Sequence, residues 1–226
     1  MKNFRERVLS SFKRTRSIHQ RFGIVACMID ILYRCLARVT YFKILKGMTL
    51  TLDSIDNQFL ETDPGRKGEV ISGHNIRSLT KPKIGMTQEF IDGAVKRGDW
   101  SYVFREQDKI VSYGLYSKSK VPIDANFTIH YSDQYTYMYK GYTTPEYRGE
   151  MLHAIGMAHA LSNVARTGGK GLISYVEANN FSSLKSCERL GYKIFGSCWL
   201  FRIFGRFVVL RSPGCRRFEF GVEMAG

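Results

Sequence analysis

The first forty residues alternate apolar and basic side chains at the spacing of an amphipathic helix. In the first part, the recurring apolar positions are Phe4, Val8, Leu9 and Phe12. A second helix is predicted from about 22 to 42, after a break near Gly23. One of its faces carries a charged stripe of Asp30, Arg34 and Arg38, and the other carries Val25, Met28, Ile29, Leu32, Leu36 and Val39. The pattern therefore predicts helix over 4–46, ended by Gly47.

Beyond Gly47 the pattern changes to short strands and turn residues. A strand is predicted over 48–52. The glycines and prolines of 54–85 favour loop, and Thr87 is placed to cap a short helix over 88–97. The remaining predicted elements are hairpins 100–105/109–118 and 126–131/135–144, a helix over 149–166, a strand over 171–177, a helix over 182–190, and a hairpin 192–204/206–211. This order predicts an α/β (α+β) layer fold around a mixed, mainly antiparallel sheet, preceded by N-terminal helices.

Positive charge is concentrated at the N-terminus. Residues through Lys46 hold eleven lysines and arginines against Glu6 and Asp30, a net charge of +9, which leaves +5 of the total +14 for the other 180 residues. We therefore divide the chain into a basic amphipathic helical extension, 1–46, and a domain, 47–226. An anionic partner is expected for the extension. An anionic membrane surface fits an apolar stripe that is flanked by arginines and lysines. The alternative is a helical pair packed on the domain with its basic face solvated.

Cysteine usage and the N-terminal sequence favour a reducing compartment. The five cysteines form no C-x-x-C pair, and no histidine lies at a zinc-ligand spacing, so neither a disulfide framework nor a metal site is expected. The first apolar run follows basic sequence, lacks a signal-peptide cleavage site and contains Asp30. It is also shorter than the roughly 20 residues that a spanning helix needs. We expect a cytoplasmic protein, peripheral at the inner face of the membrane if the extension binds lipid.

The stretch Tyr139–Phe195 carries two spaced motifs. A strand leads through Pro-x-Tyr-Arg-Gly into the long helix, and a second strand leads through Glu-Ala-Asn-Asn-Phe-Ser-Ser to Leu-Gly-Tyr. In this order and separation, the motifs resemble the core of the GNAT (GCN5-related N-acetyltransferase) superfamily, over about 48–211 of this chain. The resemblance implies an acyltransferase that takes an acetyl or longer acyl group from acetyl-CoA or another acyl-CoA and delivers it to an amine acceptor. It names neither the acceptor nor an oligomeric state. A membrane-bound extension would fit a sugar-lipid, lipid or envelope-precursor acceptor, or a long-chain acyl donor.

Within that resemblance, the segment Arg148–His153 corresponds to the loop that holds the coenzyme A pyrophosphate. Such a helix start suits an anion because its N–H groups are unpaired and carry partial positive charge. Arg148 matches the family's pattern, whereas Met151 and His153 stand where the family has small residues. The implied cofactor-binding residues are Gly141, Tyr142, Thr143, Arg148, Gly149, Glu150, Met151, Leu152, His153, Asn179 and Asn180. Gly141 is expected to form a bulge in a strand that splays from 171–177 and leaves a gap for the thioester arm.

The catalytic candidates implied by the same resemblance are Tyr139, Glu146 and Cys187. Cys187 stands where the family often has a tyrosine that protonates the departing thiolate, although a buried structural cysteine is the competing interpretation. A general base is expected among Tyr139, Glu146 and Glu177. Two functions of other classes remain: a non-catalytic GNAT-like binding module, and an N-acyltransferase that depends on an acyl carrier. Nucleic acid is disfavoured as a partner because no binding module is recognisable.

Overall fold

The computed structural model describes residues 2–62, 65–80 and 86–225, and the side chains of all of these except 2–5, 7, 8 and 80. Its α-helices are α1 (Lys2–Val39), α2 (Gln58–Glu61), α3 (Gln88–Lys96), α4 (Leu152–Arg166) and α5 (Phe181–Leu190). Its strands are β1 (Phe42–Leu50), β2 (Lys67–Ser72), β3 (Trp100–Glu106), β4 (Lys109–Ser117), β5 (Val121–Pro122), β6 (Phe127–His130), β7 (Tyr135–Thr143), β8 (Gly171–Glu177), β9 (Lys193–Ile203), β10 (Arg206–Arg211) and β11 (Gly221–Met224). Short 3-10 helices are η1 (Gly73–Thr80), η3 (Pro145–Tyr147) and η4 (Pro213–Phe218).

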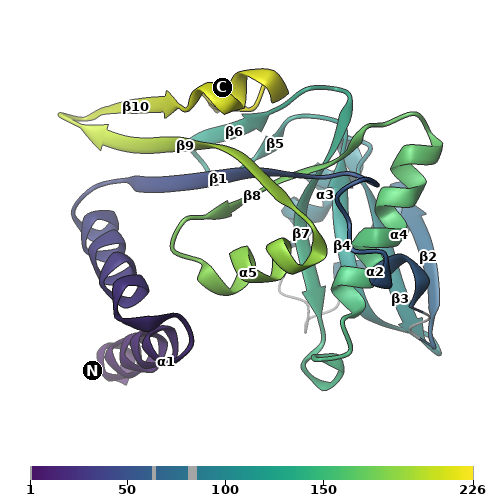
Figure 1. Cartoon of the computed structure of the whole chain (residues 1–226), viewed down its shortest axis with the longest axis horizontal. Helices are drawn as coiled ribbons and strands as arrows, with labels where there is room; N and C mark the ends of the chain where they lie inside the picture. The colour runs from purple at the N-terminus through teal and green to yellow at the C-terminus, as the bar shows by residue number, and fades with distance from the viewer. Residues whose placement is uncertain (1, 63–64, 81–85, 226) are drawn as a thin grey trace.

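An eight-stranded sheet with the order β10-β9-β1-β8-β7-β4-β3-β2 organises the molecule (Figure 1). All its neighbouring strands are antiparallel except the central pair β7 and β8. Helices α4 and α5 pack over one face, where Leu50, Ile155, Leu161 and Leu172 are buried together. The opposite face, with Leu45, Ile173 and Leu200, is covered by the small sheet β11-β6-β5. The predicted fold class is confirmed.

In the N-terminal segment the helix ends earlier, and the strand after it begins earlier, than the sequence predicts. Gly23 has a φ of 83° inside α1 and divides it into two halves, which confirms the break. The prediction that helix continues to 46 is wrong: α1 ends at Val39, and 42–46 belong to β1, between β8 and β9. The predicted boundary between 46 and 47 therefore falls inside a central strand. The apolar and lysine residues of 42–46 suit a helix or a strand, and pairing with β8 and β9 on both sides decides the outcome.

Two further expectations are wrong. Strand β6 forms no hairpin with β7 but pairs with β5 and β11, because the chain turns away at Ser132, whose N–H donates to the Phe218 carbonyl. The loop predicted over 54–85 contains α2, β2 and η1 in its described part, whereas 63–64 and 81–85 lie outside the described residues. Strand β2 lies at the sheet edge, and its polar side chains conceal the strand pattern.

The hairpins β3–β4 and β9–β10, the helices α3, α4 and α5, and the strand β8 lie where the sequence predicts them. In the described residues, no helix has the apolar length that crossing a bilayer would require. A group of three or more His, Cys, Asp or Glu side chains suited to a metal is also absent from that part of the chain.

Candidate active site

The two parallel strands separate after a short paired stretch, as the family resemblance implies. Tyr135, Thr136 and Tyr137 of β7 face Gly171, Leu172 and Ile173 of β8. Beyond these positions no further backbone pair joins the two strands in the described residues, although β7 continues to Thr143 and β8 to Glu177. Ser174 bridges the start of the split, because its hydroxyl donates to the Met138 carbonyl over 2.7 Å. Beyond Ser174 the described edges of β7 and β8 face each other without a ladder pair.

A cavity of about 870 Å³ occupies this split and extends to the start of α4. Its wall includes Met138, Ser174 and Val176 from the face that α4 and α5 cover, and Tyr139 and Tyr175 from the opposite face. The cavity therefore reaches between the strands rather than resting on one side of the sheet. Its volume falls in the range of about 300–1,000 Å³ that is usual for small-molecule sites.

Residue Tyr139, not Gly141, forms the bulge in β7. Leu115 of β4 faces Lys140 and Tyr116 faces Met138, which leaves Tyr139 without a partner. The prediction of a bulge at Gly141 is therefore wrong, since Gly141 stays in register opposite Gly114. Gly141 is needed for another reason: a Cβ added there would lie 1.9 Å from Cε1 of His153. The glycine makes room for the imidazole of the first turn of α4.

The segment before α4 has the backbone shape expected of an anion-binding loop. Gly149 has a φ of 99° and Met151 has a φ of 57°, so both adopt left-handed conformations immediately before the helix. Met151 caps the helix without a side-chain hydrogen bond, and the first internal bond is from Ile155 N–H to the Met151 carbonyl. The N–H groups of the first turn are thus available to a ligand. Left-handed backbone favours glycine, which is the kind of residue that the family pattern places at 151.

The charged side chains near this loop differ in whether they have an ion-pair partner. Arg148 is exposed, and its Nε reaches only the Thr143 carbonyl, at 3.4 Å; it has no carboxylate partner in the described residues. Glu150 is paired with Arg66, so its negative charge beside the loop is compensated. His153 is largely buried, and burial lowers its pKa to about 4. The imidazole is therefore neutral at physiological pH.

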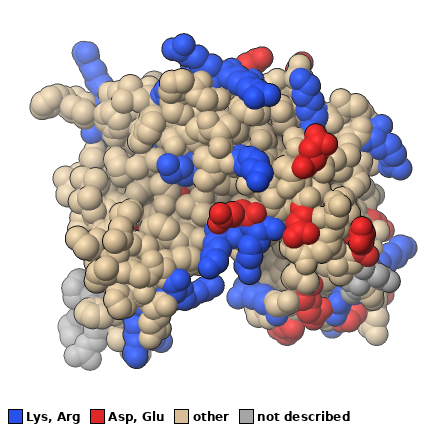
Figure 2. All heavy atoms as spheres, viewed as in Figure 1, with Lys and Arg blue, Asp and Glu red and all other residues tan. Residues whose placement is uncertain are grey.

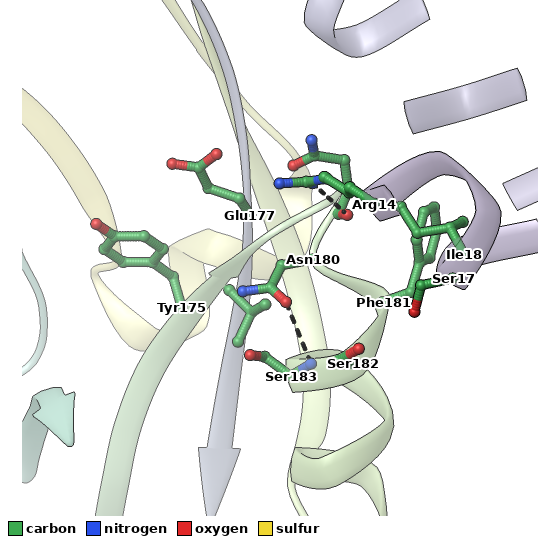
Figure 3. Close-up of a pocket in the computed structure, with 11 residues that line it drawn as sticks. Arg14, Ser17, Ile18, Tyr175, Glu177, Asn180, Phe181, Ser182 and Ser183 are labelled. Carbon is green, nitrogen blue, oxygen red and sulfur yellow. Dashed lines mark hydrogen bonds between the residues drawn. The ribbon is translucent and has the colours of Figure 1, made fainter. Parts of the chain in front are cut away.

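A second cavity, of about 670 Å³, adjoins the first and shares Tyr175, Val176, Ser182 and Ser183 with it. Figure 3 shows this cavity between the end of β8, the start of α5 and the first half of α1. Tyr175 and Glu177 project to the same side of β8, whereas Arg14 and Ile18 come from α1. The Asn180 side chain accepts a hydrogen bond from Ser183 N–H and so caps α5.

Helix α1 is attached to this region by polar contacts. The buried Asp30 carboxylate pairs with Arg14 and Arg34, each at 2.8 Å, and accepts a hydrogen bond from the Asn179 side chain at 3.0 Å. Tyr33 accepts from Ile44 N–H and donates to Glu177 over 3.4 Å. Burial is the main reason that the pKa of Tyr33 rises to about 12. These contacts make α1 part of the second cavity's wall.

Comparison with solved structures identifies this arrangement. An acetyltransferase of the GNAT family from Colwellia psychrerythraea superposes with a TM-score of 0.50 at 12% identity, over 80% of this chain and 61% of that one. A GNAT-family protein from Novosphingobium aromaticivorans gives a TM-score of 0.50 at 17% identity, over 70% and 63%. A GCN5-related N-acetyltransferase from Sphaerobacter thermophilus gives 0.50 at 13%, over 79% and 55%. The chain has the GNAT fold.

At these identities the likeness concerns the fold alone, and the chain spans about three-fifths of the length of these structures. No family model and no curated protein sequence matches the chain. What the GNAT fold carries in this chain therefore has to be argued from its own residues.

The GNAT fold brings most of the predicted residues to the two cavities. The first cavity is lined by Tyr139, Gly141, Thr143, Arg148, Gly149, Met151, Leu152, His153 and Cys187. Asn179 and Asn180 line the second. Three predicted residues line neither cavity: Tyr142, Glu146 and Glu150. The Tyr142 ring stacks against Tyr113 of β4, and the two glutamates are exposed.

The three candidate bases differ in their hydrogen-bond partners and in their position relative to the cavities. The Tyr139 hydroxyl donates to buried Asp99 over 2.8 Å, and burial raises its pKa, which argues against a role as base. Glu146 is exposed in η3 and lines neither cavity. Glu177 lines the second cavity, and no lysine or arginine is paired with it in the described residues. Among the three, Glu177 has the carboxylate best placed to meet an amine.

Cys187 lies in the wall of the first cavity and is partly buried. Burial raises the pKa of its thiol to about 11, so the thiol stays protonated at neutral pH. The cavities are also lined by four residues that were not predicted: Ser174, Tyr175, Ser186 and Arg14. A serine inside the otherwise apolar strand β8 was a signal for the first of these. Arg14 gave none, because only the folding of α1 onto β8 brings it here.

Proposed function

We propose that this protein is an N-acyltransferase that moves an acyl group from a coenzyme A thioester to an amine. One observation carries the proposal: the cavity between splayed strands β7 and β8 runs into the start of α4, where the backbone is shaped for an anion. The thioester arm would lie in the split, against the unpaired strand edges. The pyrophosphate would meet the first-turn N–H groups of α4 and Arg148.

The acceptor would approach through the second cavity. Its amine nitrogen would attack the thioester carbonyl carbon, the C–S bond would break, and the sulfur would leave as a thiolate that takes up a proton. Glu177 would bind the incoming ammonium group and accept the proton that the nitrogen loses, directly or through water. The adjoining walls of the two cavities support this arrangement because they bring donor and acceptor together at Tyr175 and Val176.

Calorimetric titration with coenzyme A, dephospho-coenzyme A and pantetheine tests the donor assignment. Replacing Arg148 with alanine removes a charge-assisted contact and should weaken coenzyme A binding about tenfold. Dephospho-coenzyme A should still bind, whereas pantetheine should bind poorly to the unaltered chain and lose little more in the variant. The matched control is Arg166→Ala, because Arg166 is exposed at the other end of α4, where it contacts Asn163.

Met151→Gly gives the opposite test. Glycine accepts the left-handed backbone at 151 without the cost of roughly 1–2 kcal/mol that other residues bear. The variant should bind coenzyme A at least as tightly as the unaltered chain and should be no less stable to heat. Equal affinity for pantetheine and coenzyme A, with no effect of Arg148→Ala, would overturn the assignment of the loop.

Thiol release measured with acetyl-CoA, longer acyl-CoA and acyl-carrier donors against a panel of amines tests turnover. Glu177→Gln should raise KM for the amine and leave coenzyme A affinity unchanged. Coenzyme A binding without thiol release for any donor and amine would instead establish a non-catalytic binding module.

A further inference from the structure

The second half of α1 is oriented with its apolar side outward. Its buried positions are Ala26, Cys27, Asp30 and Tyr33, which include a carboxylate and a phenol. The exposed apolar side chains form what we call the outer face of α1: Ile24, Val25, Met28, Ile29, Leu32, Leu36 and Val39. Met28 is 64% exposed, Leu32 62% and Val39 87%. Of the two predicted alternatives, the helical pair packed on the domain agrees with these contacts in part, because α1 does pack on the domain, but it packs through a largely polar side and leaves its apolar stripe exposed.

Polar contacts on the inner side fix this orientation. Asp30 is held by Arg14, Arg34 and Asn179, and Tyr33 by Ile44 and Glu177. Rotation of the second half of α1 to bury the outer face would remove the contacts with Arg14, Asn179, Ile44 and Glu177, and leave Asp30 only its partner within the helix, Arg34. Large contiguous apolar patches on a protein surface mark sites where another molecule binds.

Exposed basic side chains lie on the same helix as the outer face. Lys13, Arg16, Arg21 and Arg38 are exposed on α1 and form no ion pair in the described residues. The tip of the β9–β10 hairpin adjoins the end of α1, since the Thr40 hydroxyl donates to the Arg202 carbonyl over 2.7 Å. That tip presents a fully exposed Phe204 between Arg202 and Arg206.

Both elements lie at the same end of the molecule, on the left of Figure 1. Figure 2 shows that in this view the acidic side chains gather mainly over the centre and the opposite end. An apolar helix face, on a segment with a large excess of positive charge, matches the boundary between anionic headgroups and acyl chains.

We propose that the outer face of α1 binds an anionic lipid bilayer, with α1 lying along the interface. A second copy of the chain suits this surface less well, because residues 2–39 contain nine lysines and arginines against Glu6 and Asp30, and two such segments would repel each other. A bilayer with acidic headgroups supplies both the apolar layer and the opposite charge. The proposal rests on the surface of α1 and does not depend on acyl transfer.

Flotation of the full chain with mixed phosphatidylcholine–phosphatidylserine vesicles tests this. The full chain should bind these vesicles, should bind pure phosphatidylcholine vesicles much less, and should dissociate as salt rises, since charges are screened over about 8 Å at physiological salt. The double variant Met28→Gln/Leu32→Gln keeps good helix formers and removes only exposed side chains, so the fold should persist by circular dichroism. Its vesicle affinity should fall about tenfold or more.

A second double variant, Arg16→Gln/Arg21→Gln, tests the charge contribution. Each basic residue near an anionic surface contributes about fivefold in affinity, so the pair should lower it by about twentyfold or more and reduce the salt dependence. The control is Val70→Gln, because Val70 is 46% exposed on β2, at the opposite edge of the sheet. This variant should float like the unaltered chain.

Three results would overturn the proposal. The first is flotation of Met28→Gln/Leu32→Gln equal to that of the unaltered chain. The second is equal binding to neutral and anionic vesicles. The third is self-association of the unaltered chain in sedimentation, lost in the Met28/Leu32 variant, without vesicle binding by either; the occupant of the face would then be a second copy.

Discussion

The stability of the protein should depend on pH through His153, in the first turn of α4. Its imidazole packs over Gly141 of β7, and burial lowers its pKa from 6.5 to about 4. In the unfolded chain the same group has its ordinary pKa, so between pH 6.5 and 4 the unfolded state binds the extra proton. Stability contributed by the neutral imidazole is therefore complete above pH 6.5 and is lost as pH falls toward 4.

The size of the effect follows from the difference between the two pKa values. One pKa unit corresponds to about 1.4 kcal/mol, so the shift to about 4 amounts to about 3 kcal/mol in the free energy of unfolding. That is a large part of the roughly 5–15 kcal/mol that stabilises most domains. The lost stability should appear first around the loop before α4, since the proton would have to enter between His153 and Gly141.

Urea unfolding at a series of pH values between 7.5 and 4.5 measures this. His153→Gln removes the titrating group and keeps a polar side chain, so its overall stability should be lower but less dependent on pH. The difference between the two proteins should narrow by about 2–3 kcal/mol across the series. His130 and His159 also have lowered pKa values, because both are partly buried, but they are present in both proteins and cancel. The same pH slope in both proteins would refute the reasoning.

Three other outcomes are expected. Cys187→Ser should keep activity within about threefold, and Cys187→Tyr should preserve or raise it; a hundredfold loss of turnover with the fold intact would show that this thiol is essential. Because burial raises the pKa of Cys187 to about 11, iodoacetamide at pH 8 should modify exposed Cys35 far faster than Cys187. Asp30→Ala leaves Arg14 and Arg34 without their carboxylate and should destabilise the docking of α1 by about 2–3 kcal/mol. Amide hydrogens over 24–39 should then exchange faster than those in the rest of the chain. Equal protection of these amides and the others would contradict this. Gly141→Ala should weaken coenzyme A binding, since a Cβ there displaces His153 toward the cavity, and calorimetry with unchanged affinity would count against that placement.

Several features of the site were decided by the sequence alone. The Pro-x-Tyr-Arg-Gly and Asn-Asn-Phe-Ser-Ser motifs are local, because each places turn and cap residues next to a helix start, and local hydrogen bonds determine the outcome. Asn180 caps α5, and the left-handed turn at Gly149 precedes α4, in the segments where these motifs predict helix starts. The separation of β7 from β8 was predictable only through the resemblance to a known family, since neither strand's own sequence encodes where pairing ends.

The fate of the N-terminal segment depended on the tertiary structure. Its periodicity identified an amphipathic helix, a break at Gly23 and the two stripes, but periodicity does not tell which stripe faces the domain. Contacts with residues distant in sequence determine which stripe faces the domain: Asn179 contacts Asp30, and Glu177 contacts Tyr33. The end of the helix was decided the same way, because β8 and β9 take up 42–50 as a strand between them.

The roles of Asn179, Gly141 and Tyr139 show the same division. Each is a site candidate in the sequence, and each has a partner that only the folded chain supplies: Asp30, His153 and Asp99. A sequence specifies which side chains have the chemistry to form a site, since that property belongs to each residue. Whether a given side chain points into the cavity or is used to hold the cavity together depends on packing between elements far apart in the chain, and is decided only when the strands and helices meet.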